Sequence, residues 1–201
     1  ALALIEVDYE VLPHVIDVTE AMQPDAPLLH EDMITRGMET APDKPSNIAK
    51  YVEFASGDVA EGFAQADHIV EMEFTTKPVH QGYIEPHACL ARYDQNGQGE
   101  IWCSSQGHFT VRALTAKLVG MKQADLTVTE AEVGGAFGGK TVVYLEPVAL
   151  VLARKSGRPV KLAMNRQEVF KASGPTSGSA MKVKLGASAD GTITAAEASF
   201  M

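Results

Sequence analysis

The sequence predicts an α+β fold in which mixed sheets are packed against helices. Some segments alternate apolar and polar residues, as half-buried strands do, whereas others place apolar residues at helical spacing. The two kinds do not follow a strict strand-helix-strand order, and no internal repeat is evident. A chain of 201 residues with 45% hydrophobic residues is also long enough to bury a substantial core.

The first third of the chain predicts a strand, a long connection and a short helix. Alternate apolar residues from Leu2 to Val11 indicate a half-buried strand that is closed by Pro13. Residues 22–48 hold four prolines and no sustained period, so we expect a surface connection and a boundary between two packed units there. Asp58 is placed to cap a short amphipathic helix within 57–67, and the alternating 68–76 follows as a strand.

The rest of the chain predicts two hairpins and three helices. Asn96-Gly97 supplies the left-handed residues of a tight turn between strands 83–94 and 100–105. A helix over 110–119 should end at Gly120, and a helix within 142–155 should begin only near Glu146, because Pro147 is tolerated at a first position. A short helical turn should start at residue 165. The remaining strands are expected at 126–133, 160–164, 180–186 and 192–200, the last two joined by a turn at 189–191.

Charge and cysteine content exclude several classes of function. The formal net charge of −9 and the pI near 5.1 argue against a nucleic-acid or anionic-membrane surface. No stretch of about 18 apolar residues and no export signal is evident, so we expect no membrane span. Cys89 and Cys103 are too few for an iron–sulfur cluster or a Cys-rich zinc site, and a reducing, cytoplasmic setting is the default. Both cysteines lie on the predicted hairpin strands and are expected to be buried neighbours.

Three histidines invite a metal hypothesis that their spacing does not favour. His80, His87 and His108 are separated by 7 and 21 positions, which places no pair on one helical face. We therefore expect no metal ligands in the chain.

Residues 134–141, GGAFGGKT, match the phosphate-binding pattern G-x-x-x-x-G-K-[ST]. In a nucleotide hydrolase Lys140 would face the terminal phosphates and Thr141 would bind magnesium. Only sixty residues follow Thr141, and no apolar strand ending in an acidic residue is available to hold the metal. A nucleotide-binding module nevertheless stays open as the alternative, as does a simple Gly-rich turn. The bare amides favour an anionic or oxo ligand and Phe137 suits a flat one, whereas a simple Gly-rich turn would only permit tight packing.

Four markers give the chain a more specific resemblance. They are QGYIEPHACLARYD, CSSQ, VGGAFGGK and EPVALVLARKSGRPVKLAMNRQEVF, in this order. In these stretches the chain resembles the molybdopterin-binding large subunit of the xanthine dehydrogenase and aldehyde oxidase family of molybdenum hydroxylases. The resemblance implies that residues 1–28 are the tail of an α/β hammerhead domain with its linker, and that 29–201 are the N-terminal part of a molybdopterin-binding domain.

The resemblance also implies a site. Gln106 would hydrogen-bond the apical oxygen of molybdenum, since an amide donates to an oxo ligand without titrating. The other implied cofactor-binding residues are Gly135, Ala136, Phe137, Gly138 and Gly139. Glu85-Pro86-His87 would border the cofactor region. The catalytic glutamate of the family lies outside these residues, so the chain alone is expected to be a partial, inactive site.

The implied reaction is hydroxylation by water, or the related dehydrogenation, of an electrophilic carbon. Purine-oxidising members carry a glutamate where this chain has Thr141, and an arginine in the following substrate loop, where this chain has Gly174-Pro175-Thr176. These two substrate-pocket positions disfavour xanthine and leave aldehydes, N-heteroaromatic acids and aromatic thioesters open. The cysteine-bearing loop of the carbon monoxide oxidising branch is not found, which argues against copper.

The cofactors and partners are likewise implied by the resemblance. The full protein should carry a molybdenum cofactor, molybdopterin in its cytosine dinucleotide form, with iron–sulfur centres and FAD on partner chains or domains. We expect a small-molecule substrate, an oligomeric complex with iron–sulfur and flavin subunits, and no nucleic-acid or membrane partner.

Overall fold

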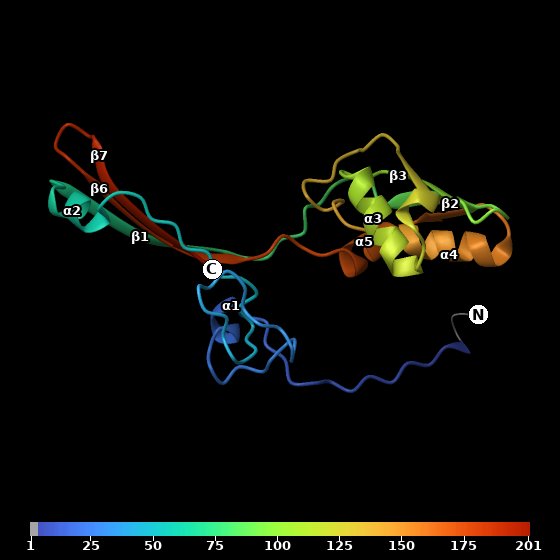
Figure 1. The fold of residues 1–201 in the computed structure, drawn as a ribbon, viewed down its shortest axis with the longest axis horizontal. Coiled ribbons are helices and arrows are strands. Elements are labelled where there is room, and N and C mark those ends of the chain that lie inside the picture. Colours follow the sequence, from blue (N-terminus) through green and yellow to red (C-terminus); the bar gives the residue numbers. More distant parts are fainter. Residues whose placement is uncertain (1–3) are drawn as a thin grey trace. The chain divides into compact units, whose positions relative to one another are not determined.

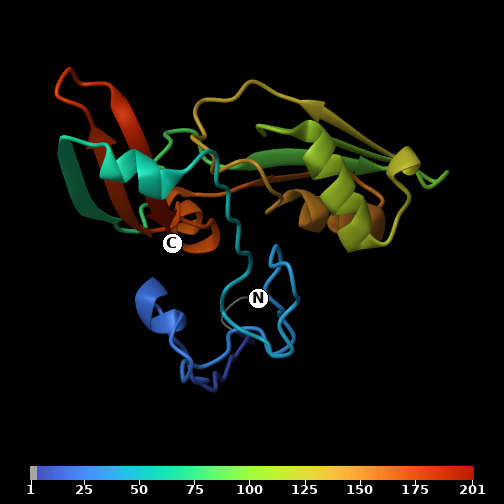
Figure 2. The ribbon, with the colours of Figure 1, turned by 60° about the vertical axis from the view of Figure 1, so that its left-hand side comes forward.

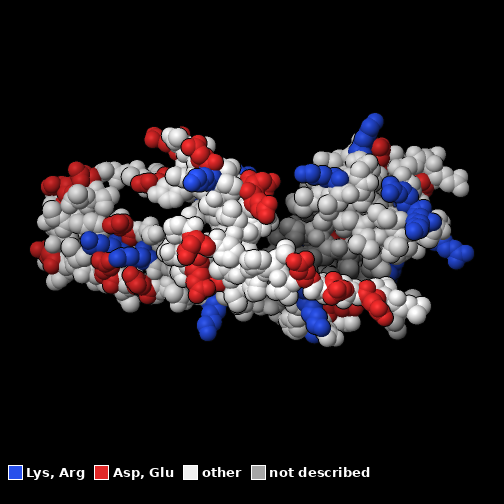
Figure 3. All heavy atoms as spheres, turned by 90° about the horizontal axis from the view of Figure 1, so that it is seen from below, with Lys and Arg blue, Asp and Glu red and all other residues white. Residues whose placement is uncertain are grey.

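A computed structural model describes residues 4–201. The chain divides into two compact units, one made by the residues up to Thr76 with Gly178–Met201, the other by Lys77–Ser177. Their elements are labelled in Figure 1. On the face drawn in Figure 3, Lys and Arg side chains are interspersed with Asp and Glu. Among the described helices, none combines the length and the apolar character needed to cross a membrane.

The first unit is built on a three-stranded antiparallel sheet of order β1-β6-β7. Its strands are β1 (His68–Thr76), β6 (Ser179–Ala187) and β7 (Ile193–Phe200). Helix α2 (Val59–Ala64) packs on β6 and β7, and its first turn is capped by Asp58, which accepts a hydrogen bond from the Glu61 N–H (Figure 2). These elements confirm the predicted capped helix, the strand 68–76 and the C-terminal hairpin.

The predicted N-terminal strand is wrong. Residues 5–17 form no helix or strand, and the predicted start at Leu2 lies outside the described residues. A strand is stable only when a neighbour pairs with its backbone, and none of the residues that the structure describes pairs with this segment. The side chains of Tyr9 and Val11 are accordingly 81% and 80% exposed.

The following segment is a long connection, as expected, but the two compact units divide after Thr76 and after Ser177 rather than within it. Asp17 caps a short helix that was not predicted, α1 (Val18–Ala21), and accepts hydrogen bonds from the Thr19 and Glu20 N–H groups. From residue 22 to residue 48 the chain forms no helix or strand, and Arg36 makes an isolated β-bridge to Lys50.

The second unit is a four-stranded sheet of order β4-β3-β2-β5. The hairpin of β2 (Ala88–Tyr93) and β3 (Gly99–Cys103) is confirmed, with a turn in which Asp94 accepts hydrogen bonds from the Asn96 and Gln98 N–H groups. Helix α3 (His108–Val119) and the short 3-10 helix η2 (Gln123–Asp125) then cross to β4 (Leu126–Glu130), which pairs parallel with β3. The remaining elements are α4 (Glu146–Ser156), β5 (Val160–Ala163) and α5 (Arg166–Ala172).

Helices α3 and α4 cover one face of this sheet (Figure 1). Burial alternates along β2 and β3, so every second side chain enters the core, which includes Ala91, Ile101, Val111 and Leu150. Cys89 and Cys103 are directly paired in register, buried and unbridged, which confirms that they are neighbours.

Two predicted strand boundaries shift, and one helix begins where it was expected. The first hairpin strand begins at Ala88 rather than at residue 83, because the preceding side chains turn to other partners and Pro86 has no N–H for a sheet. Strand β4 ends at Glu130 rather than at 133, because the chain there enters the glycine loop. Helix α4 begins at Glu146 with proline in its first turn, as expected.

Candidate functional site

Residues 134–141, called the glycine loop below, connect β4 to α4 and are anchored by one carboxylate. Glu85 Oε2 accepts a hydrogen bond of 2.9 Å from the Gly134 N–H and one of 2.5 Å from Lys140 Nζ. One side chain therefore holds both ends of the loop. Burial acts to raise the pKa of Glu85, but the hydrogen bonds from Lys140 and Gly134 outweigh it and leave that pKa below its ordinary value.

Lys140 is a structural cation inside the second unit. The residue is only 1% exposed, and its Nζ also lies 3.4 Å from Ser104 Oγ and 5.2 Å from the centre of the Tyr83 ring. A phosphate-binding lysine must reach a ligand, whereas this ammonium is enclosed and neutralised by Glu85. Helix α4 starts at Glu146, so its N-terminus does not follow the loop directly as a phosphate cradle requires. The nucleotide-binding alternative therefore has no support.

Gln106 lies against the glycine loop, which is the convergence that the sequence predicted. Its Oε1 accepts hydrogen bonds from the N–H groups of Gly138 and Lys140, at 3.1 and 3.2 Å. The backbone N–H of Gln106 donates to the Lys140 carbonyl at 3.0 Å, and Ser105 Oγ donates to the same oxygen at 3.1 Å. Because two donors fix the carbonyl oxygen of the amide, the Nε2 end points away from them. Nε2 has no partner among the described residues, and the side chain is exposed.

The centre of the loop is shaped to present Phe137. This residue has a φ of 50°, which an L side chain rarely adopts, and it is 76% exposed. Gly139 cannot carry a side chain, because a Cβ there would lie 2.6 Å from Cε1 of Tyr83. In the described part of the chain, the N–H groups of Gly135, Ala136 and Phe137 have no acceptor. The loop therefore combines three N–H groups that have no acceptor with an exposed aromatic ring.

The two predicted substrate-pocket residues lie on different segments of the second unit. Thr141 is exposed and donates from Oγ1 to the Gly138 carbonyl at 3.1 Å. Thr176 pairs with Val79 through two backbone hydrogen bonds and accepts a third, of 3.2 Å, from Gln81 Nε2. Among the described residues, no hydrogen bond joins Thr176 directly to the glycine loop.

Two residues of the site were not predicted to hold the loop: Tyr83 and Glu85. A lysine embedded in a glycine-rich stretch signals that a carboxylate could pair with it. The sequence cannot choose among the 26 acidic residues, because the partner lies 55 positions upstream.

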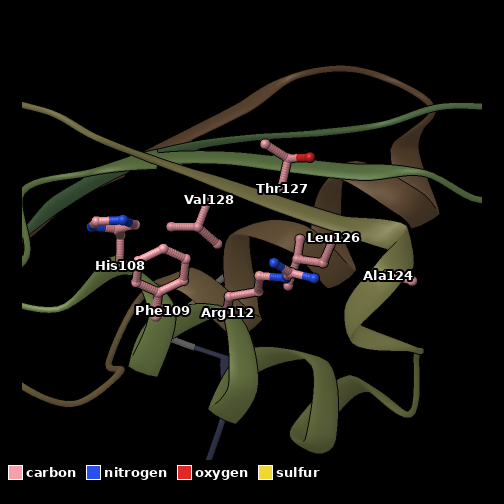
Figure 4. Close-up of a pocket in the computed structure, with 7 residues that line it drawn as sticks. All are labelled: His108, Phe109, Arg112, Ala124, Leu126, Thr127 and Val128. Carbon is pink, nitrogen blue, oxygen red and sulfur yellow. The ribbon is translucent and has the colours of Figure 1, made fainter.

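The histidines take separate roles. Burial, followed by the charges of Lys140 and His80, lowers the pKa of His87 to about 4, and its Nε2 lies 2.6 Å from the Tyr83 hydroxyl. His108 pairs with Glu130 at 3.0 Å. His108 also lines a hollow of about 150 Å³ between α3 and β4, where Figure 4 shows it beside Phe109 and Arg112. No residue of the glycine loop lines that hollow.

Solved structures share this fold. A carbon monoxide dehydrogenase from Oligotropha carboxidovorans matches 99% of the chain with a TM-score of 0.78 at 30% identity, over 25% of its own length. An aldehyde oxidoreductase from Desulfovibrio gigas matches 97% with a TM-score of 0.77 at 30% identity, over 20% of its own length. The fold is therefore that of the molybdopterin-binding part of molybdenum hydroxylase large subunits, as the resemblance implied.

The sequence comparisons give the family. The molybdopterin cofactor-binding domain model matches residues 40–201. "Probable hypoxanthine oxidase XdhD" of Escherichia coli is 34% identical over 224 aligned residues, which cover all of this chain and 23% of the relative. The chain belongs to the molybdopterin cofactor-binding domain family of xanthine dehydrogenase-type oxidoreductases, and it spans about a quarter of the length of these relatives.

Proposed function

We propose that this chain supplies one wall of the molybdenum cofactor site of an oxidoreductase that hydroxylates or dehydrogenates an electrophilic carbon, with water as the oxygen source. The observation that carries the proposal is the Gln106 amide, whose oxygen is fixed by two loop N–H groups while its nitrogen remains free to donate. When bound, the cofactor supplies the two-electron redox chemistry of the reaction.

The donor set fits an oxygen-rich, anionic group. Gln106 Nε2 can donate to a metal oxygen ligand without a proton that titrates near neutral pH. The free amides of Gly135, Ala136 and Phe137 add fixed dipoles on the same loop, and the Lys140 charge beneath it is neutralised by Glu85. Gly139 lets the backbone pass close to Tyr83, Gly138 allows a φ of 91°, and the ring of Phe137 would shield one side of a bound group from water.

The substrate proposal rests on Thr141 and Thr176. Neither side chain carries a charge, so neither can orient a purine by a bidentate ion pair. An aldehyde, an N-heteroaromatic acid or an aromatic thioester therefore suits the pocket better than xanthine, although one relative is named as a hypoxanthine oxidase. We further propose the cytosine dinucleotide form of the cofactor and a complex with iron–sulfur and flavin subunits.

The test uses the full-length protein and its Gln106→Leu variant. We expect stoichiometric molybdenum by metal analysis in both, and a loss of about 100-fold in kcat for the variant, the size typical of one lost transition-state donor. Gln98→Leu is the control, because Gln98 lies in the β2–β3 turn and bonds only Asp94 and Asp125. A full-length protein that contains no molybdenum, or a Gln106→Leu variant with unchanged turnover, would contradict the proposal.

A further inference from the structure

The short segment from Val79 to Tyr83 lies between the glycine loop and the segment that carries Thr176. On one side Val79 and Thr176 exchange backbone hydrogen bonds of 3.2 and 2.8 Å, and Gln81 Nε2 donates to Thr176 Oγ1 at 3.2 Å. On the other side a Cβ at Gly139 would lie 3.1 Å from Gln81 Oε1 and 2.6 Å from the Tyr83 ring. This segment therefore touches both parts of the proposed pocket.

The Tyr83 hydroxyl reaches the end of helix α5. Its oxygen lies 3.2 Å from Ser173 Oγ, and Ser173 is the C-cap of that helix, three residues before Thr176. Ser173 Oγ in turn donates to the Val169 carbonyl at 2.5 Å and bonds His80 Nε2 at 3.0 Å. Both residues are almost fully enclosed, Tyr83 at 1% and Ser173 at 6% exposure.

The protons of this network can be assigned. His80 Nδ1 accepts from the Gly82 N–H, so His80 Nε2 carries the hydrogen and donates to Ser173 Oγ. Because Ser173 gives its own proton to Val169, the Tyr83 hydroxyl must donate to Ser173 and accept from His87 Nε2. In this arrangement the Tyr83 hydroxyl has both a donor and an acceptor, which gives it one fixed direction.

The Tyr83 hydroxyl reaches Ser173, whereas the Tyr83 ring contacts the glycine loop. It packs against the backbone at Gly139, and the Lys140 ammonium lies over its face. A phenol is rigid between its ring edge and its oxygen, so the two ends cannot move independently.

We propose that Tyr83 is a positioning residue that sets where Thr176 lies relative to the glycine loop, and thereby sets substrate affinity. This inference rests on the proposed function, since it takes Thr176 to contact the substrate. Tyr83 itself touches neither substrate nor cofactor. Loss of its hydroxyl should loosen the Ser173–Thr176 segment and leave the glycine loop in place, because the ring alone contacts the loop.

The test compares Tyr83→Phe with Ser173→Ala in the full-length protein, because each removes the same hydrogen bond from one end. We expect KM to rise about fivefold, the factor for one neutral hydrogen bond, with kcat within about twofold and molybdenum content unchanged. Amide hydrogen exchange at Thr176 should accelerate by a similar factor. The double variant should be less impaired than the two single effects combined, because the Tyr83–Ser173 hydrogen bond is lost only once. Tyr93→Phe is the control, because Tyr93 lies in β2 and its hydroxyl makes no hydrogen bond among the described residues. It should change none of these quantities.

The outcomes separate the two proposals. Unchanged KM and exchange in both variants would refute the positioning role while leaving cofactor binding intact. Faster exchange with unchanged KM would equally refute it, because the segment would then not set affinity. If the full-length protein held no molybdenum, the proposed function would fail, and the positioning inference would fall with it. If Tyr83→Phe did not fold, an unchanged KM in Ser173→Ala would still refute the positioning role, because that variant also removes the Tyr83–Ser173 hydrogen bond.

Discussion

Replacement of Glu85 by Gln tests whether one carboxylate holds the glycine loop. The substitution keeps the shape of the side chain but leaves the Lys140 ammonium, 1% exposed, without a counter-charge. Loss of one partner of a buried ion pair costs about 3–5 kcal/mol of unfolding free energy, and we expect about 3 because the Gln oxygen can still accept from Nζ. The reverse change, Lys140→Met, should cost only about 1–2 kcal/mol, since the Glu85 side chain is 34% exposed and keeps the Gly134 N–H.

Urea unfolding followed by circular dichroism measures these differences, and thermal unfolding should show a fall of about 9 °C for Glu85→Gln at about 3 °C per kcal/mol. The double variant should be less destabilised than the sum of the two single ones, because it buries no unpaired charge. Glu100→Gln is the control, since it breaks the ion pair to Arg92, which is 61% exposed, and should cost under about 1 kcal/mol. A Glu85→Gln protein as stable as the control would refute the anchoring role.

Three further outcomes follow from the same geometry. Gly139→Ala should lower the free energy of unfolding of the second unit by about 1–3 kcal/mol, because the added methyl group overpacks the site. At Gly138 the methyl group meets open space, so Gly138→Ala should cost only about 1 kcal/mol, from its φ of 91°. Chemical denaturation measures both changes. The pKa of His87 is about 4 when folded and 6.5 when unfolded, so between these values only the unfolded chain binds the proton. The free energy of unfolding should therefore fall by about 3 kcal/mol from pH 6.5 to pH 4. Urea titrations at several pH values measure this fall, and it should be smaller in the His87→Gln variant. Burial, then the Glu146 charge, raises the pKa of Cys89 and Cys103 to about 12, so iodoacetamide should label neither thiol at pH 8 until urea is added; rapid native labelling would contradict the buried pairing.

The elements that the sequence predicted well are those whose signals are local. Asn96-Gly97 specifies its own turn, and Asp58 caps its own helix. Asn165 and Glu168 form a reciprocal capping box within one turn of α5. In each case the residues that decide the conformation lie within four positions of one another.

The failures come from information that is not local. Residues 4–11 alternate as a strand does, but a strand also needs a neighbouring backbone, which a pattern cannot supply. The glycine loop matches a phosphate-binding pattern because such a pattern records that residue 140 is a lysine but not where its side chain points. The direction of that side chain is decided by Glu85 and Tyr83.

The site itself was predicted in part. The proximity of Gln106 to the loop followed from a resemblance over four markers in register. The orientation of its amide did not, because it depends on two backbone N–H groups whose directions are set by the loop conformation.

The parallel pairing of β3 with β4 has a consequence for the order of assembly. Strand β3, helix α3 and strand β4 are consecutive in the chain, so their contacts close short loops, whereas the carboxylate and the ammonium that fasten the glycine loop meet across 55 positions. The scaffold should therefore form before the loop is fastened, and substitutions at that fastening should speed unfolding while leaving the folding rate nearly unchanged. We therefore expect the glycine loop to be the last part of the second unit to form and the first to open.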